Sequence, residues 1–249
     1  MARAPGTAVA GFFASLSGLV APTSMRAVGS AVRAFAGFAG RGDLAEAVRL
    51  IGFQRRRATA PVLSDADLAA VLGAAGGGSV TARDAAITLL AVSTGLRACD
   101  ICALTLGDVD WRAGRISLVQ AKTGNPLTLP LPAAAGNATA RYLLEERPVT
   151  ASRSVFVRSV APHVALSGHS SVPLAIGRVF DQAGIAPRPL GTRLTRHSAA
   201  SRMLAAGVPH PTISAVLGHA DPASVDAYLD TDTDAMRRCV LPLPKAARP

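Results

Sequence analysis

The chain has 249 residues, of which 49% are hydrophobic, and a net charge of +10 at pH 7. No apolar run reaches the roughly 18 residues of a membrane-spanning helix, and Cys99, Cys102 and Cys239 are too few for a disulfide framework. We therefore expect a soluble cytoplasmic protein. The first 20 residues have a weak apolar core and are interpreted as folded protein rather than as a signal peptide.

The basic charge predicts a polyanionic partner, with nucleic acid favoured over an acidic membrane. Residues 1–60 contain eight arginines and only two acidic residues, so the charge is concentrated early. Among the 26 basic residues only Lys122 and Lys245 are lysines. A lysine in such an arginine-rich chain suggests a position that needs an ammonium group.

The apolar pattern predicts a helix over 23–39, capped by Thr23 or Ser24, with Phe35 on its buried face. Three consecutive arginines with glycine and proline predict a linker near 52–61. We therefore expect two domains, over 1–58 and 62–249.

In the second domain, Ser64 and Asp67 predict a capping box for a helix whose apolar stripe includes Leu72. Thr81 and Gly95 mark the ends of the next helix. Alternating runs at 115–120 and 126–131 predict a β-hairpin, with Lys122 near its tip. Further helices are expected at 97–104, 133–146, 171–183, 195–206, 211–217 and 222–229. The predicted fold is mostly α with a small β-hairpin or sheet.

Cys99 and Cys102 form a C-x-x-C motif, but neither a second pair nor a histidine stands at ligand spacing. We interpret both cysteines as helix-packing residues, and we expect no metal and no other cofactor.

Four stretches together carry the functional signal: STGLRACDICALTLGDVDW (93–111), AKTGNPLTLPLP (121–132), RLTRHSAASRMLAAGV (193–208) and LGHADPASVDAYLD (217–230). In this order they resemble the tyrosine recombinases, the family of phage integrases and related site-specific recombinases. The resemblance spans about 62–240, and more loosely 9–50, which resembles part of the family's helical, SAM-like core-binding domain that clamps DNA. It implies the DNA breaking-rejoining fold for the catalytic domain.

The resemblance implies that Arg97 and Arg196 bind the scissile phosphate. A guanidinium is permanently charged and donates two parallel hydrogen bonds, which suits the charge that develops on phosphate oxygens. Asp100, one helical turn after Arg97, is expected to orient it. Without these motifs, each arginine would be read as a solvated surface group.

The resemblance also assigns Lys122 as the group that protonates the departing 5′ oxygen, and His219 as a hydrogen-bond donor to the phosphate. Tyr228, nine residues after His219, is the implied nucleophile that forms a 3′-phosphotyrosyl link. The alternatives are a turn lysine that contacts a backbone phosphate, a structural histidine and a packing tyrosine. Tyr142 lacks such motif neighbours and keeps the packing interpretation.

One position departs from the family. Arg193 stands where the family usually has histidine, or sometimes lysine, and arginine is a poor proton acceptor. The resemblance begins partway through the core-binding domain, so we expect the first helices of that domain to be missing. These two departures leave open a catalytically impaired or truncated DNA-binding relic. A type IB topoisomerase, which shares the chemistry, is a further alternative to a recombinase. The expected partners are double-stranded DNA and, as the resemblance implies, three further copies of the chain in a homotetramer.

Overall fold

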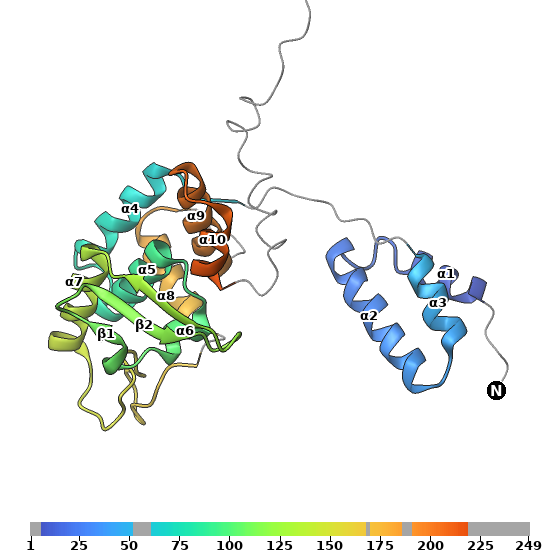
Figure 1. Ribbon diagram of the computed structural model, residues 1–249, viewed down its shortest axis with the longest axis horizontal. Helices are drawn as coiled ribbons and strands as arrows, with labels where there is room; N and C mark the ends of the chain where they lie inside the picture. The colour runs from blue at the N-terminus through green and yellow to red at the C-terminus, as the bar shows by residue number, and fades with distance from the viewer. Residues whose placement is uncertain (1–5, 52–60, 168–169, 186–190, 219–249) are drawn as a thin grey trace, which may run out of the picture. The chain divides into compact units, whose positions relative to one another are not determined.

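In a computed structural model of the chain, the described residues are 6–51, 61–167, 170–185 and 191–218. The chain divides into two compact units, Met1–Ala58 and Thr59–Pro249. Figure 1 shows helices in the described part of the first unit, and a small sheet lying against helices in the second. Among the described residues, no helix is long and apolar enough to cross a membrane.

Residues 6–51 of the first unit form three helices, α1 (Gly6–Ser15), α2 (Pro22–Phe38) and α3 (Gly42–Leu50). Val9, Phe13 and Val48 form its buried centre. Two predictions for α2 are wrong. The helix begins one residue earlier, at Pro22, whose fixed φ and missing N–H suit the first turn. The N-cap is therefore Ala21, which has no polar side chain to cap the helix. Phe35 is 64% exposed, since the helix is rotated to bury its neighbour Ala36 instead.

The second unit is built around α5 (Ala82–Thr94), which is buried along most of its length. It packs against α4 (Asp65–Gly76), α7 (Ala133–Arg141), α8 (Ser171–Gln182) and α9 (Gly191–Ala205). The predicted caps are confirmed: Ser64 and Asp67 form the capping box of α4, and Thr81 caps α5. Leu72 of α4 is 50% exposed, so its predicted place in the buried stripe is wrong.

The remaining elements surround this helical core. They are α6 (Ala98–Ala103), the 3₁₀ turn η1 (Leu106–Asp108), the π-helical turn η2 (Tyr142–Glu146) and α10 (His210–Leu217). A three-stranded antiparallel sheet of order β1-β2-β3 comprises Val109–Asp110, Arg115–Val119 and Pro126–Pro130. The predicted hairpin is β2 with β3. The two-residue β1 was not predicted, because so short a strand has no alternation to detect.

Candidate functional site

Three helices meet where α5 ends at Gly95, and this junction positions the candidate arginines. Gly95 has φ +68°, and a β-carbon there would lie 3.0 Å from Leu217 Cδ2 and 3.1 Å from Ala199 Cβ. A larger residue would therefore be strained and would separate α5 from α9 and α10. Glycine at this position allows Arg97, two residues later, to lie next to the end of α10.

Arg97 and Arg196 both donate to backbone carbonyls at the end of α10. Arg97 Nη2 donates to the Gly218 carbonyl oxygen over 2.8 Å. Arg196 Nη2 donates to the Leu217 carbonyl oxygen, and its Nη1 donates to that of Gly95 over 2.9 Å. The final carbonyls of a helix lack intrahelical donors and carry partial negative charge, so guanidinium groups stabilise them. The two arginines predicted to act together thus meet at one helix end.

Asp100 connects Arg97 to the β-hairpin. Its carboxylate is buried, with Oδ2 3.9 Å from Arg97 Nη1 and Oδ1 accepting the Ala121 N–H over 2.8 Å. The pairing predicted between Arg97 and Asp100 is therefore present. Neither Arg97 Nη1 nor Asp100 Oδ2 has a hydrogen-bond partner within the described part of the chain. Arg97 thus retains a buried donor that is not used by the described residues.

Lys122 lies in the exposed turn between β2 and β3, as the hairpin pattern predicted. The turn is closed by the Gln120 N–H donating to the Asn125 carbonyl and the Gly124 N–H donating to the Gln120 carbonyl. The exposed ammonium is free to reach a ligand outside the protein. The hydrogen bond from the Ala121 N–H to Asp100 ties the base of this turn to the arginine pair.

Gln120 was missed by the sequence analysis, although it is a buried polar residue of this site. Its Oε1 accepts the Thr123 hydroxyl over 2.6 Å, and its side chain packs against Gly218. The alternation of β2 could have predicted this position. Ile116 and Leu118 face inward, and Gln120, two residues later, lies on the same face, so a polar side chain was to be expected among buried apolar ones.

Arg193 is exposed on α9, one turn before Arg196. The two arginines act electrostatically on His197. Burial first, and then the charges of Arg193 and Arg196, lower the pKa of His197. The field around this part of α9 therefore favours anions and disfavours an additional proton.

The two remaining candidates, His219 and Tyr228, lie outside the described residues, as do the predicted helix at 222–229 and residues 52–60 of the linker predicted near 52–61. Gly218, which precedes His219, caps α10 with φ +59°. Tyr142 is buried, stacks on Phe156, and its hydroxyl accepts the Val157 N–H. These contacts fit its interpretation as a packing residue.

The C-x-x-C cysteines lie on α6. Burial raises the pKa of Cys102 to about 11 and also raises that of Cys99, where Asp100 adds to the effect. Both groups are therefore thiols rather than thiolates at neutral pH. Within the described ranges, no three histidine, cysteine or acidic side chains gather as a metal site.

Residues 61–234 match the sequence model of the phage integrase family. The chain is 40% identical over 166 residues to the putative integrase/recombinase y4rA of Sinorhizobium fredii, covering 67% of this chain and 40% of that protein. It is 36% identical to y4gC of the same organism, covering 74% of this chain and 95% of that one. The tyrosine recombinase XerD of Mycobacterium tuberculosis is 30% identical over 78% of this chain and 64% of its own length.

Solved structures share the fold. The XerH site-specific recombinase bound to its palindromic difH substrate gives a TM-score of 0.74 at 16% identity, covering 95% of this chain and 72% of that one. A lambda integrase dimer bound to a core site gives a TM-score of 0.70 at 16% identity, covering 98% of this chain and 84% of that one. The mostly helical fold with a small antiparallel sheet is therefore that of the tyrosine recombinases.

Proposed function

The chain belongs to the phage integrase family of tyrosine recombinases, and we propose that it cleaves and rejoins DNA at specific sites through a 3′-phosphotyrosyl intermediate. The observation that carries this proposal is the meeting of Arg97 and Arg196 at the end of α10, directly before His219. Two guanidinium groups at one point form a site for a phosphodiester. Arg97 Nη1 is a buried donor from which a phosphate oxygen can accept a hydrogen bond.

In the proposed reaction, the Tyr228 hydroxyl oxygen attacks phosphorus and the bond from phosphorus to the 5′ oxygen breaks. Lys122 gives a proton to the departing 5′ oxygen, because an ammonium can release a proton whereas guanidinium cannot. Arg97, Arg196 and His219 donate to the non-bridging oxygens. Attack by a 5′ hydroxyl of another strand reverses these steps and frees Tyr228.

The proposed partners are double-stranded DNA and further copies of the chain. Exchange of strands needs two duplexes, and a lambda integrase of the same fold was solved as a tetramer bound to a Holliday junction, with a TM-score of 0.67. We assign residues 1–58 to the partial core-binding domain and 62–249 to the catalytic domain. The net charge of +10 supports DNA as the ligand. Neither a metal nor a nucleotide is needed in this reaction.

Covalent trapping tests this function. The purified protein is incubated with nicked suicide duplexes from the DNA that flanks its gene, then denatured and examined for a protein-DNA adduct. We expect an adduct that is lost in Tyr228→Phe and kept in Tyr142→Phe, the matched control at the buried tyrosine. An adduct that persists in Tyr228→Phe would refute the assigned nucleophile.

A second function, DNA binding without productive cleavage, is favoured by Arg193, which is a poor proton acceptor at a position where the family usually has histidine. That function predicts a salt-sensitive shift of DNA in a gel without any adduct. Relaxation of supercoiled plasmid without a preferred site would instead favour a type IB topoisomerase.

A further inference from the structure

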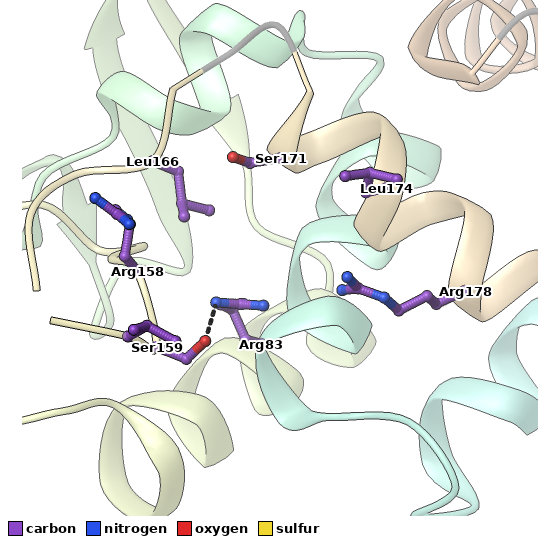
Figure 2. Close-up of a pocket in the computed structure, with 8 residues that line it drawn as sticks. Arg83, Arg158, Ser159, Leu166, Ser171, Leu174 and Arg178 are labelled. Atoms are coloured by element: carbon purple, nitrogen blue, oxygen red, sulfur yellow. Dashed lines mark hydrogen bonds between the residues drawn. The ribbon is translucent and has the colours of Figure 1, made fainter.

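A second basic site lies in the second unit, at the opposite end of α5 from Arg97. A cavity of about 210 Å³ is lined by Arg83, Arg158 and Arg178, together with Ser159, Ser171 and Leu174 (Figure 2). Arg83 is the second residue of α5, whereas Arg97 follows its last turn. A helix of 13 residues is about 20 Å long, so this cavity is separate from the candidate cleavage site.

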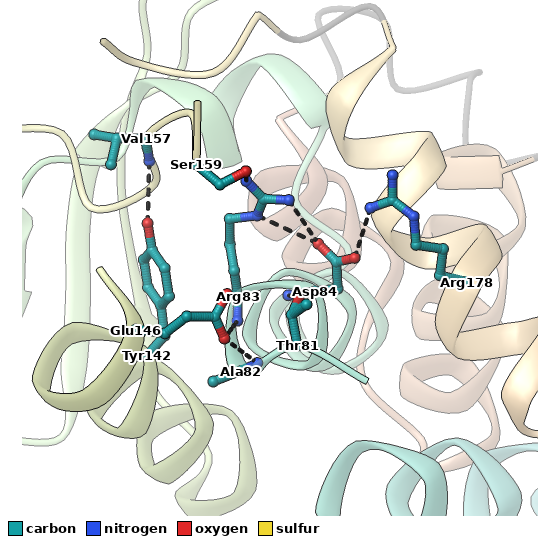
Figure 3. A network of polar contacts seen from close by, with 9 residues as sticks. All are labelled: Thr81, Ala82, Arg83, Asp84, Tyr142, Glu146, Val157, Ser159 and Arg178. Carbon is teal, nitrogen blue, oxygen red and sulfur yellow. Dashed lines mark hydrogen bonds and ion pairs between the residues drawn. The ribbon is translucent and has the colours of Figure 1, made fainter. Parts of the chain in front are cut away.

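A buried carboxylate holds two of the three arginines in place. Asp84 Oδ2 accepts from Arg178 Nη1 over 2.7 Å, and Oδ1 accepts from Arg83 Nε and Nη2 over 3.3 Å each. Arg83 Nη1 also donates to Ser159 Oγ over 3.3 Å. Figure 3 shows Ser159, Arg83, Asp84 and Arg178 joined in one row by these contacts. The guanidinium groups of Arg83 and Arg178 are therefore positioned before any ligand arrives.

The charge around the cavity is not balanced. Asp84 is shared by Arg83 and Arg178, and Arg158 has no ion pair with a described residue. Glu146 accepts the backbone N–H groups of Ala82 and Arg83 and does not line the cavity. The lining residues include three arginines and no acidic residue, so the surface that faces the cavity is positively charged.

The start of α8 adds a second feature that favours an anion. Ser171, its first residue, lines the cavity, and the first turn of α8 contains no acidic residue. The Ser170 side chain makes no capping hydrogen bond. The partial positive charge at this end of a 12-residue helix therefore adds to the field of the three arginines.

We propose that this cavity binds a phosphate group, distinct from the scissile phosphate. A phosphate carries up to two negative charges and several acceptor oxygens, which matches donors that come from three directions, whereas a carboxylate offers two oxygens and one charge. The group can come from free phosphate or from a DNA backbone outside the cleavage site. The proposal does not depend on strand cleavage, because binding alone is measured.

The test uses the full chain with Tyr228→Phe, so that cleavage cannot interfere. The thermal midpoint is measured with inorganic phosphate and with acetate at constant ionic strength, and duplex binding is measured over a salt series. Arg158→Gln is the test variant, because Arg158 is exposed and its loss leaves the Asp84 contacts intact. Arg112→Gln is the control, because it removes an equal charge from an exposed turn outside the cavity.

If the source is free phosphate, phosphate raises the midpoint more than acetate does, and Arg158→Gln removes that gain while Arg112→Gln keeps it. If the source is DNA, the salt dependence of duplex binding falls by about one unit in Arg158→Gln and not in Arg112→Gln. The proposal is overturned if acetate matches phosphate and the salt dependence is unchanged, or if both variants behave alike. Failure of cleavage in the active chain would affect only the proposed function.

Discussion

The Gln120 side chain lies so close to Gly218 that a β-carbon added at residue 218 would overlap the Gln120 amide group. Gln120 belongs to the hairpin that carries Lys122, and Gly218 precedes His219. The contact therefore joins two segments that the proposed reaction needs to hold in register. Gln120 is buried and its Oε1 accepts from Thr123, which limits its freedom to move aside.

The first prediction concerns the double requirement for glycine at 218. Gly218→Ala places a side chain at φ +59°, which costs about 1 to 2 kcal/mol, and forces it into Gln120, which adds roughly 1 to 3 kcal/mol. We expect the free energy of unfolding, measured in urea, to fall by the sum of the backbone cost and the cost of the clash. Covalent trapping should fall as well, because the clash displaces the end of α10 relative to the hairpin that carries Lys122.

Gly207→Ala is the matched control. Gly207 has φ +77° but nothing within 4 Å of an added β-carbon, so only the backbone cost should appear. Adding Gln120→Ala to Gly218→Ala should recover the part that is due to the clash. Equal costs at 207 and 218 would show that the Gln120 contact does not constrain the site.

The second prediction contrasts the roles of two buried carboxylates, Asp100 beside Arg97 and Asp84 beside Arg83 and Arg178. Asp100→Asn keeps an acceptor for the Ala121 N–H but removes the charge beside Arg97. We expect cleavage by folded protein to slow about tenfold, equivalent to roughly 1.4 kcal/mol of transition-state stabilisation. Asp84→Asn, which alters the ion pairs with Arg83 and Arg178, should leave the cleavage rate of folded protein near that of the parent. Equal slowing in both variants would argue for a general loss of stability.

The third prediction is a dependence of stability on pH. The pKa of His197 is lowered in the folded state, so the unfolded chain binds this proton more readily. The free energy of unfolding should therefore fall as pH drops below about 6.5, the ordinary histidine pKa, and rise again toward neutral pH. His197→Gln should flatten this part of the profile in urea unfolding. An unchanged slope in that variant would assign the dependence to other groups.

Local signals in the sequence were enough to predict much of the fold. The caps at Ser64 and Thr81 are formed with residues three positions away in the chain, so the residue types in a short stretch of sequence are enough to predict them. The same holds for Gly95 and Gly218, whose positive φ ends α5 and α10. Lys122 was placed correctly because the turn of a hairpin follows from its two flanking strands.

Features that depend on distant packing could not be read in this way. Phe35 and Leu72 are apolar residues at helical spacing, yet each lies beside the buried stripe rather than in it, because the rotation of a helix is set by its neighbours. The pairing of Asp84 with Arg178 joins residues 94 positions apart. The catalytic roles of all six candidates remain predictions from the family resemblance: Arg97, Lys122, Arg193, Arg196, His219 and Tyr228.

The last prediction tests the departure from the family at Arg193. This residue is exposed on α9 one turn before Arg196, so a histidine can replace it without repacking the core. An imidazole can exchange a proton near neutral pH and guanidinium cannot, so Arg193→His should raise the rate of adduct formation, by up to about 100-fold. The gain should appear as pH rises through about 6.5, where imidazole loses its proton and becomes a base.

Arg193→Gln, which also removes the charge but cannot titrate, should show no such pH-dependent gain. If both variants gain equally, the native arginine acts through its charge; if neither gains, arginine is accommodated in the reaction and proton transfer at this position does not limit cleavage.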